Sequence, residues 1–286
     1  MSTKRLSILG SFLLTAAALS IAAPAHAEEF ANKIPDLVWV DIGGSVNELT
    51  SSVGLTGQNG VGATIDMEQI FDIPGSKTTF AIYGTARVSA QRRHVDFGYV
   101  NIDRSGSRQI QQDIKWGDYT FAAFGTVTAD VNTEFIYGAY RYDFLHDEKV
   151  RISGSAGLSW VNLGASLSGD GTYTNPDTGD LAYGSFEKDS SVGIPVPLIG
   201  FNIDWAMTKG LVFRSYYRFF RLNASGINGG MYESGVHMNW YFIRNLGLGV
   251  GYDRTEIRLN EYKSGNNTAK ADYMVSGIGL YATLAF

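Results

Sequence analysis

The 286-residue sequence contains no cysteine and only six prolines, and beyond its first 27 residues it has no apolar run long enough for a membrane-spanning helix. Without cysteine the fold can use neither a disulfide nor thiolate chemistry. Acidic residues outnumber basic ones by 28 to 23, and the absence of a basic cluster argues against a nucleic-acid partner. No two histidines stand at the spacing of metal ligands, so the sequence predicts no metal site and no cofactor.

The N-terminus has the pattern of a secretory signal peptide. Lys4 and Arg5 precede an apolar run over residues 6–23, and Ala25-His26-Ala27 follows as a cleavage site of small residues. A membrane anchor is the alternative, but the apolar run is short and the cleavage site is well formed. We therefore expect a signal peptide over residues 1–27 and a single domain over residues 28–286.

The rest of the chain is rich in Tyr (16), Phe (16) and Gly (34), and its apolar residues recur at every second position. The pattern is clearest at 231–242, where Tyr232, Val236 and Trp240 share one face while Glu233 and His237 share the other. Such alternation predicts β-strands with one apolar and one polar face. It recurs at 80–88, 95–99, 136–144, 150–160, 199–205, 211–220 and 246–253.

The last strand, from about Asp272, ends on an aromatic residue. Ile278, Leu280 and Phe286 lie on its apolar face. Bacterial outer-membrane barrels resemble one another in this ending, which the barrel-assembly machinery reads as a signal. We therefore assign Phe286 as the barrel-assembly signal, with that machinery and periplasmic chaperones as expected partners.

Short polar turns alternate with long polar stretches, at 104–118, 166–191 and 259–271, which are expected to be loops. This arrangement predicts an all-β fold: a single transmembrane antiparallel β-barrel of about ten strands, with both termini in the periplasm and the surface facing outer-membrane lipids. Counts of 8 to 12 strands remain open, because residues 47–78 are difficult to assign. Residues 61–71 look like an additional strand, and 119–128 could hide another.

From about Asp36 to Phe286 the chain resembles a family of uncharacterised proteobacterial outer-membrane β-barrel proteins. The segments that carry the resemblance are 62–68, 92–94, 103–107, 195–200 and 247–252. The resemblance implies a barrel in the outer membrane of a Gram-negative cell. It implies no substrate and no catalytic residue.

The polar faces of the expected strands carry ionisable residues that would line the lumen. This set is Arg87, Asp96, Arg141, Asp143, Arg151, Asp204, Arg214, Arg218, Glu233, His237 and Asp253. One interpretation is a network of ion pairs that occludes a narrow barrel with a structural or surface-interaction role. The alternative is a narrow porin-like channel through which small solutes pass. An enzyme built around His237 is a third hypothesis, but no hydrolase motif accompanies it, so we expect no catalytic residues.

Overall fold

The structure, a computed structural model, describes residues 33–35, 37–56, 62–89, 92–109, 114–116, 119–121, 126–174, 181–224, 227–264 and 267–286. The expected signal peptide lies outside these residues. The elements are β1 (Val38–Thr56), β2 (Gly62–Asp66), α2 (Met67–Phe71), β3 (Ser76–Arg87), β4 (Arg93–Gln109), β5 (Ile114–Trp116), β6 (Tyr119–Phe121), β7 (Thr126–His146), β8 (Val150–Thr174), β9 (Leu181–Thr208), β10 (Leu211–Ala224), β11 (Ile227–Ile243), β12 (Leu246–Ser264) and β13 (Asn267–Ala285). Among the described residues, no helix has both the length and the apolar character needed to cross a membrane.

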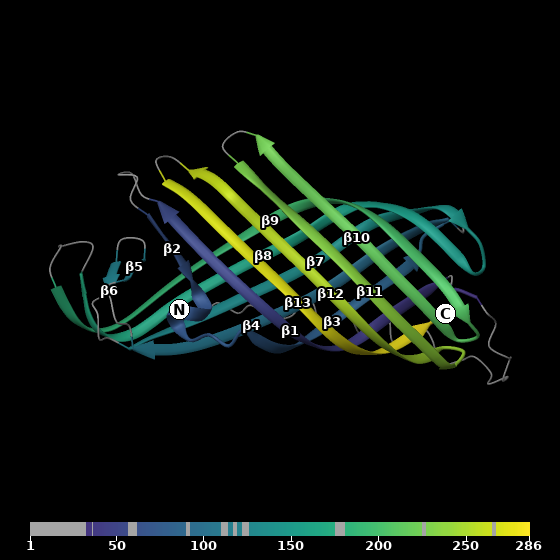
Figure 1. The fold of residues 1–286 in the computed structure, drawn as a ribbon, viewed down its shortest axis with the longest axis horizontal. Coiled ribbons are helices and arrows are strands. Elements are labelled where there is room, and N and C mark those ends of the chain that lie inside the picture. Colours follow the sequence, from purple (N-terminus) through teal and green to yellow (C-terminus); the bar gives the residue numbers. More distant parts are fainter. Residues whose placement is uncertain are drawn as a thin grey trace.

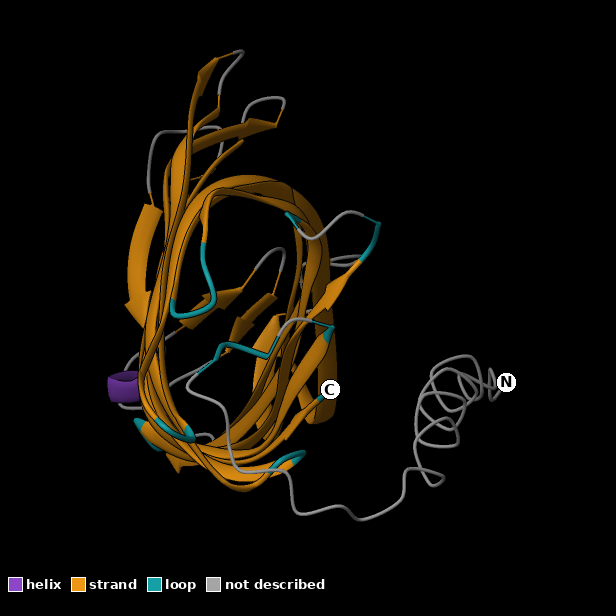
Figure 2. Ribbon diagram, turned by 90° about the vertical axis from the view of Figure 1, so that its right-hand side faces the viewer, coloured by secondary structure: helices purple, strands orange, loops and turns teal. Residues whose placement is uncertain are grey.

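The strands form a closed antiparallel barrel. Around the wall the order is β8-β7-β4-β3-β1-β13-β12-β11-β10-β9, and pairing of β8 with β9 closes the ring. The first and last strands pair along their whole length, from Trp39 opposite Ala285 to Thr56 opposite Thr268. The tilted strands are seen from the side in Figure 1 and the ring end-on in Figure 2. The expected all-β antiparallel barrel of about ten strands is confirmed.

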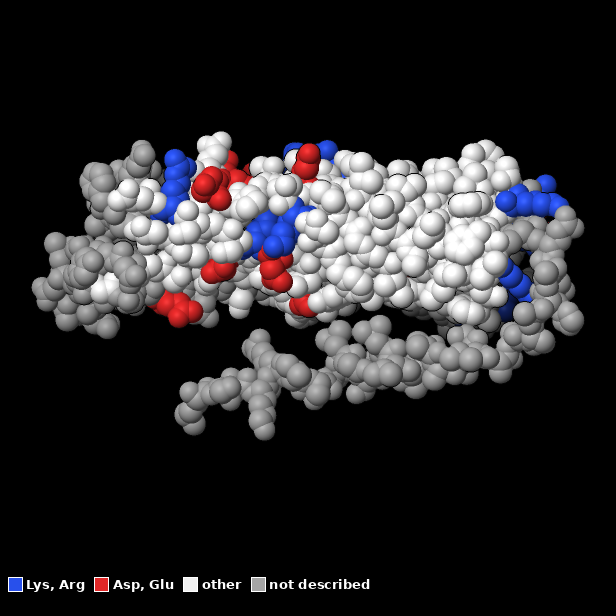
Figure 3. Space-filling view, turned by 90° about the horizontal axis from the view of Figure 1, so that it is seen from below, with Lys and Arg blue, Asp and Glu red and all other residues white. Residues whose placement is uncertain are grey.

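The barrel carries apolar side chains on its outer face. On β13 the exposed fractions of Ile278 and Leu280 are 60% and 72%, whereas the next residue, Tyr281, points inward and is 2% exposed. The aromatic residues Trp205, Trp240 and Phe242 lie on the outer face close to the short turns. Figure 3 shows an uncharged zone that begins near the C-terminal end of the barrel and is followed by mixed charges further along. Apolar side chains on the outer face of a barrel are expected where that face is in contact with an apolar environment.

Three of the expected loops are largely strand. β4 continues to Gln109, β8 and β9 pair from Thr174 opposite Leu181 onward, and β12 and β13 pair up to Ser264 opposite Asn267. The prediction of long loops at 104–118, 166–191 and 259–271 was therefore wrong for most of these residues. The reason is physical: a paired strand with polar residues on both faces keeps its backbone hydrogen bonds but loses the apolar alternation on which the prediction relied.

Residues 62–75 fill a gap in the wall. The pairing of β3 with β1 ends at Ser76 opposite Glu48, and beyond it β1 pairs with β2 instead. Asp66 caps α2 by accepting a hydrogen bond from the backbone N–H of Gln69. α2 contacts β1 on one side and β4 on the other, at the edge of the ring in Figure 2. The expectation of one strand over 61–71 is thus corrected to a short strand followed by a helix.

The described part of residues 119–128 does not form a separate barrel strand. β6 covers only Tyr119–Phe121, β7 begins at Thr126, and the residues between them lie outside the described part of the chain. β6 pairs with β5 and with the far end of β8. It therefore extends the sheet beyond the ring.

The N-terminal segment crosses the end of the barrel that carries the short turns. The backbone N–H of Ile34 donates to the carbonyl of Glu148, and Ile34 is 4% exposed. Lys33 forms an ion pair with the Glu148 side chain, and Arg151 donates to the Pro35 carbonyl at 3.2 Å. Residues 33–35 therefore lie over the lumen at this end.

Candidate functional site: the charged lumen

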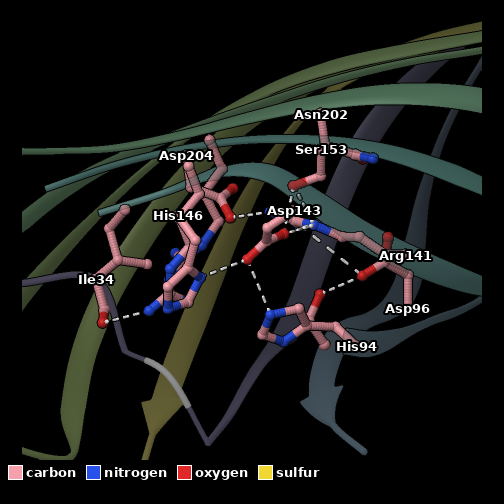
Figure 4. A network of polar contacts seen from close by, with 12 residues as sticks. Ile34, His94, Asp96, Arg141, Asp143, His146, Ser153, Asn202 and Asp204 are labelled. Atoms are coloured by element: carbon pink, nitrogen blue, oxygen red, sulfur yellow. Dashed lines mark hydrogen bonds and ion pairs between the residues drawn. The ribbon is translucent and has the colours of Figure 1, made fainter. Parts of the chain in front are cut away.

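Arg141 on β7 is the centre of the first polar cluster in the lumen, shown in Figure 4. Its guanidinium pairs with Asp204 on β9, lies 4.0 Å from Asp96 on β4, and donates to Ser153 on β8. Arg141 is 3% exposed. A planar guanidinium satisfies several acceptors at once, so one side chain connects four consecutive strands of the wall from the inside.

Asp143 lies beside Arg141 and accepts hydrogen bonds from three side chains. Ser153 Oγ donates to its Oδ1 at 2.6 Å, while His94 Nε2 and His146 Nδ1 lie 3.1 and 2.8 Å from its Oδ2. Asp143 is fully buried, His94 is 2% exposed and His146 is half-buried. Two imidazoles that are 52 positions apart in the sequence thus meet at one carboxylate oxygen.

A second cluster surrounds Arg214 on β10. Its guanidinium donates to Asn239 at 2.6 Å and to the Tyr241 hydroxyl at 3.1 Å, and it lies 4.3 Å from the ring centre of Trp39. Asn239 in turn donates to Asp41 at 2.9 Å. Because β11 and β1 are separated in the wall by β12 and β13, this last bond spans the lumen.

His237 on β11 lies between two carboxylates. Its Nε2 is 2.9 Å from Asp253 and its Nδ1 is 3.6 Å from Asp41. The ring stacks on Tyr281 and meets the edge of Tyr83 on β3, on the opposite part of the wall. Carboxylates and aromatic rings therefore hold the imidazole in the interior, where it is 5% exposed.

Further from the short turns, Arg218 on β10 closes the charged region. It pairs with Glu233 at 3.3 Å and lies 3.8 and 4.1 Å from the ring centres of Tyr137 and Tyr216. Tyr137 belongs to β7, which β8 and β9 separate from β10 in the wall, so this cation–π contact also crosses the lumen.

An apolar layer follows the charged region. Phe135 on β7 and Tyr273 on β13 face each other across the lumen with ring centres 6.3 Å apart. The layer comprises Leu49, Ile102, Phe135, Tyr137, Ala139, Val161, Leu198, Met231, Tyr273 and Val275. Side chains from most of the wall thus meet on the barrel axis.

Two cavities beside the charged clusters are small. One of about 40 Å³ is lined by Asp96, Arg141, Arg214 and His237, and another of about 50 Å³ by Tyr137, Arg218 and Glu233. Each has room for only a few water molecules.

The structure places the eleven predicted lumen residues on the inner face of the barrel, and it brings most of them together in these clusters. Arg151 instead donates to the carbonyl of Pro35 in the segment 33–35. Arg87, on β3, lies opposite His94 of β4. Asp41, His94 and His146 were missed. No expected strand included either histidine, but His94 belongs to β4 and lies on the same face as Asp96, two positions further along.

His146 could not have been placed from sequence. The register of β7 shifts between Asp143 and Leu145, so that both Phe144 and Leu145 point outward. The bulge turns His146 toward Asp143, although in a regular strand an even-numbered residue of β7 would face outward. Sequence alternation alone gives no signal for this shift.

Comparison with known proteins found no matching protein-family model and no similar curated protein. Three outer-membrane proteins of known structure are similar in fold. They are the protease OmpT of Escherichia coli (12% identity, 91% of this chain and 100% of that chain, TM-score 0.49), OprG of Pseudomonas aeruginosa (12%, 91% and 100%, 0.37) and the toluene transporter TodX of P. putida (7%, 88% and 91%, 0.34). At these values no activity and no residue role is transferred to this chain.

Proposed function

We propose that this protein is an integral outer-membrane β-barrel whose lumen is occluded, with a structural or surface-interaction role. One observation carries the proposal: side chains from strands that are not neighbours in the wall meet inside the barrel. The contacts of Arg141 with Asp204, of Arg218 with Tyr137 and of Phe135 with Tyr273 lie at successive levels of the lumen. A small barrel filled in this way leaves no continuous path for a solute.

The apolar outer face supports a place in the lipid. Barrel strands need about 9–11 residues to cross a membrane, whereas β8 and β9 have 25 and 28. We assign the short turns, and with them both termini, to the periplasmic side, because outer-membrane barrels carry their longer extensions outside. The projecting parts of β8 and β9 are then the surface available to external partners.

We propose no enzymatic role. A general base must reach a substrate proton, and the histidine with the best-placed carboxylates, His237, is enclosed by Tyr83, Tyr281 and Asp253. Its geometry favours a structural function. A hydrolytic activity that depended on His237 would contradict this assignment.

Planar-bilayer conductance of the refolded protein tests whether the lumen is occluded. We expect no discrete single-channel steps from the wild type. The triple variant Phe135→Ala, Tyr137→Ala and Tyr273→Ala removes three rings from the apolar layer, one of which is a cation–π partner of Arg218, and should give steps.

The control carries the same kind of truncation on the outer face, with Ile278→Ala, Leu280→Ala and Trp240→Ala, and should stay silent. Discrete steps from the wild type would overturn the occluded lumen in favour of the narrow channel.

A further inference from the structure

His94, Asp143 and His146 converge at the end of the barrel that carries the short turns (Figure 4). His94 lies at the start of β4, whereas Asp143 and His146 lie at the end of β7. The two strands pair, and the backbone N–H of Asp143 donates to the carbonyl of Arg92. The bulge after Asp143 then directs His146 to the same point. Two backbone features therefore hold the three side chains together.

The spacing of their polar atoms matches that of metal ligands. His94 Nε2 and His146 Nδ1 lie 3.1 and 2.8 Å from Asp143 Oδ2. Each of the three residues offers one ligand atom that lies within 4.8 Å of those of the other two. Ligand atoms bound to Zn²⁺ at about 2.0–2.1 Å in a tetrahedron are separated by about 3.3 Å. Small side-chain movements would therefore place all three atoms around one ion.

The surroundings orient the carboxylate for this role. Ser153 Oγ donates to Asp143 Oδ1 at 2.6 Å, and Arg141 Nε lies 3.6 Å from the same oxygen. Oδ2 is thereby left to face the two imidazoles. Hydrogen bonds to the non-ligating oxygen are typical of carboxylates that bind metals. The charge of Arg141, which would repel a cation, is balanced by Asp96 and Asp204.

An ion could reach the site from one side. His94 and Asp143 are buried, but the side chain of His146 is 16% exposed at the barrel end. We propose that His94, Asp143 and His146 form a binding site for one divalent transition-metal ion, with two nitrogens and one oxygen as ligands and water in the remaining position. Two imidazoles and a carboxylate suit Zn²⁺ and its neighbours in the first transition row rather than Ca²⁺ or Mg²⁺.

A metal ion would explain why two imidazoles converge on one carboxylate oxygen. Without metal, both imidazoles donate to a single carboxylate oxygen. When the ion binds, each ring presents the unprotonated nitrogen of its other tautomer, and the ion replaces both hydrogen bonds. Because β4 and β7 each supply a ligand, the ion would join the two strands next to their turn ends.

The test is calorimetric titration of Zn²⁺ into untagged, EDTA-treated protein refolded in detergent micelles. We expect one ion per chain. His146→Ala, which removes the most exposed ligand, should weaken binding by more than about 100-fold, and Ser153→Ala, which keeps all three ligands, by about 10- to 100-fold. Heat-modifiable migration in gels checks that each variant folds.

His237→Gln is the matched control, because His237 is also a lumen histidine paired with carboxylates; its binding should equal that of the wild type. The absorption spectrum of the Co²⁺-loaded wild type is a readout that needs no variant: ligation by the protein gives visible bands absent from Co²⁺ in empty micelles. Absence of these bands, equal binding by His146→Ala, or equal loss in His237→Gln would overturn the site.

Discussion

Arg141 is the residue on which most of the lumen network depends. Replacing it with Met would leave Asp96, Asp143 and Asp204 buried without their shared cation. Breaking a buried pair from one side costs about 3–5 kcal/mol, because the remaining charge is uncompensated. We expect Arg141→Met to lower the free energy of unfolding by that amount, measured by urea titration of tryptophan fluorescence in micelles.

Arg254→Met is the control for this loss. Arg254 is paired with Glu256 on the outer face, and its side chain is 45% exposed. Its removal should cost at most about 1 kcal/mol. Adding Asp204→Asn to Arg141→Met should recover part of the loss, and equal effects of the two arginine variants would refute the network as a source of stability.

The residues of this network were partly within reach of sequence reasoning. Arg214, Glu233 and His237 follow from strict alternation, which fixes the face but not the partner. Partners such as Asp41 for Asn239 depend on barrel closure, which brings together residues 198 positions apart. No local pattern encodes that distance. The functional role of the set remains a prediction.

At the scale of the strands, close contact between β7 and β8 depends on Gly157. A Cβ atom there would lie 2.2 Å from the Gly138 carbonyl oxygen and 2.4 Å from Ala139 Cβ. Gly157→Ala must push the strands apart, and overpacking of this kind costs about 1–3 kcal/mol. We expect a smaller folded fraction after refolding, read from heat-modifiable migration. Gly138→Ala, on the neighbouring strand with open space around it, should fold like the wild type.

The helix α2 is attached to the wall by a pH-dependent contact. Burial raises the pKa of the Glu68 carboxyl. Hydrogen bonds from Arg104 on β4 and from the backbone and hydroxyl of Ser51 on β1 lower the pKa by more than burial raises it, so it lies below its usual value near 4.5. A depressed pKa means that the contact stabilises the attached helix above about pH 4.5 and that this stability is lost as the pH falls through the native pKa.

Hydrogen exchange of residues 67–71 measures this attachment. Protection should be high at neutral pH and fall in acid below about pH 4.5. Glu68→Gln should give low protection with little pH dependence. Asp66→Asn, which alters the helix cap but keeps the pair with Arg104, should retain the pH-dependent step. If Glu68→Gln shows the same step as the wild type, another group controls the attachment.

The elements differ in how far sequence could predict them. β11 and β13 were recognisable because their outer faces are mostly apolar. The far halves of β8 and β9 were not, because neither of their faces is continuously apolar in sequence, although their backbones pair. α2 was missed for a third reason: its five residues bury Met67 and Phe71 in a gap that exists only because β3 is short.

At the scale of the whole molecule, the barrel closes where β13 meets β1, and Phe286 lies at this seam. Its backbone N–H donates to the Val38 carbonyl, and its own carbonyl accepts from Leu37 and Val38. The ring, 43% exposed on the outer face, contributes little to these bonds. The backbone of Phe286 therefore serves closure, which leaves its side chain available for recognition during assembly.

Separating these two roles gives the prediction for the whole barrel. If the aromatic side chain is the assembly signal, Phe286→Ser should strongly lower the amount of barrel in the outer membrane of cells, while the purified variant refolds in detergent like the wild type. Leu280→Ser removes an even more exposed apolar side chain from the same face, away from the terminus, and should reduce assembly less. Immunoblots of outer-membrane fractions and refolding yields measure the two effects. Equal assembly defects in both variants would mean that lost apolar surface, not a terminal signal, limits insertion, because only a signal depends on position along the strand.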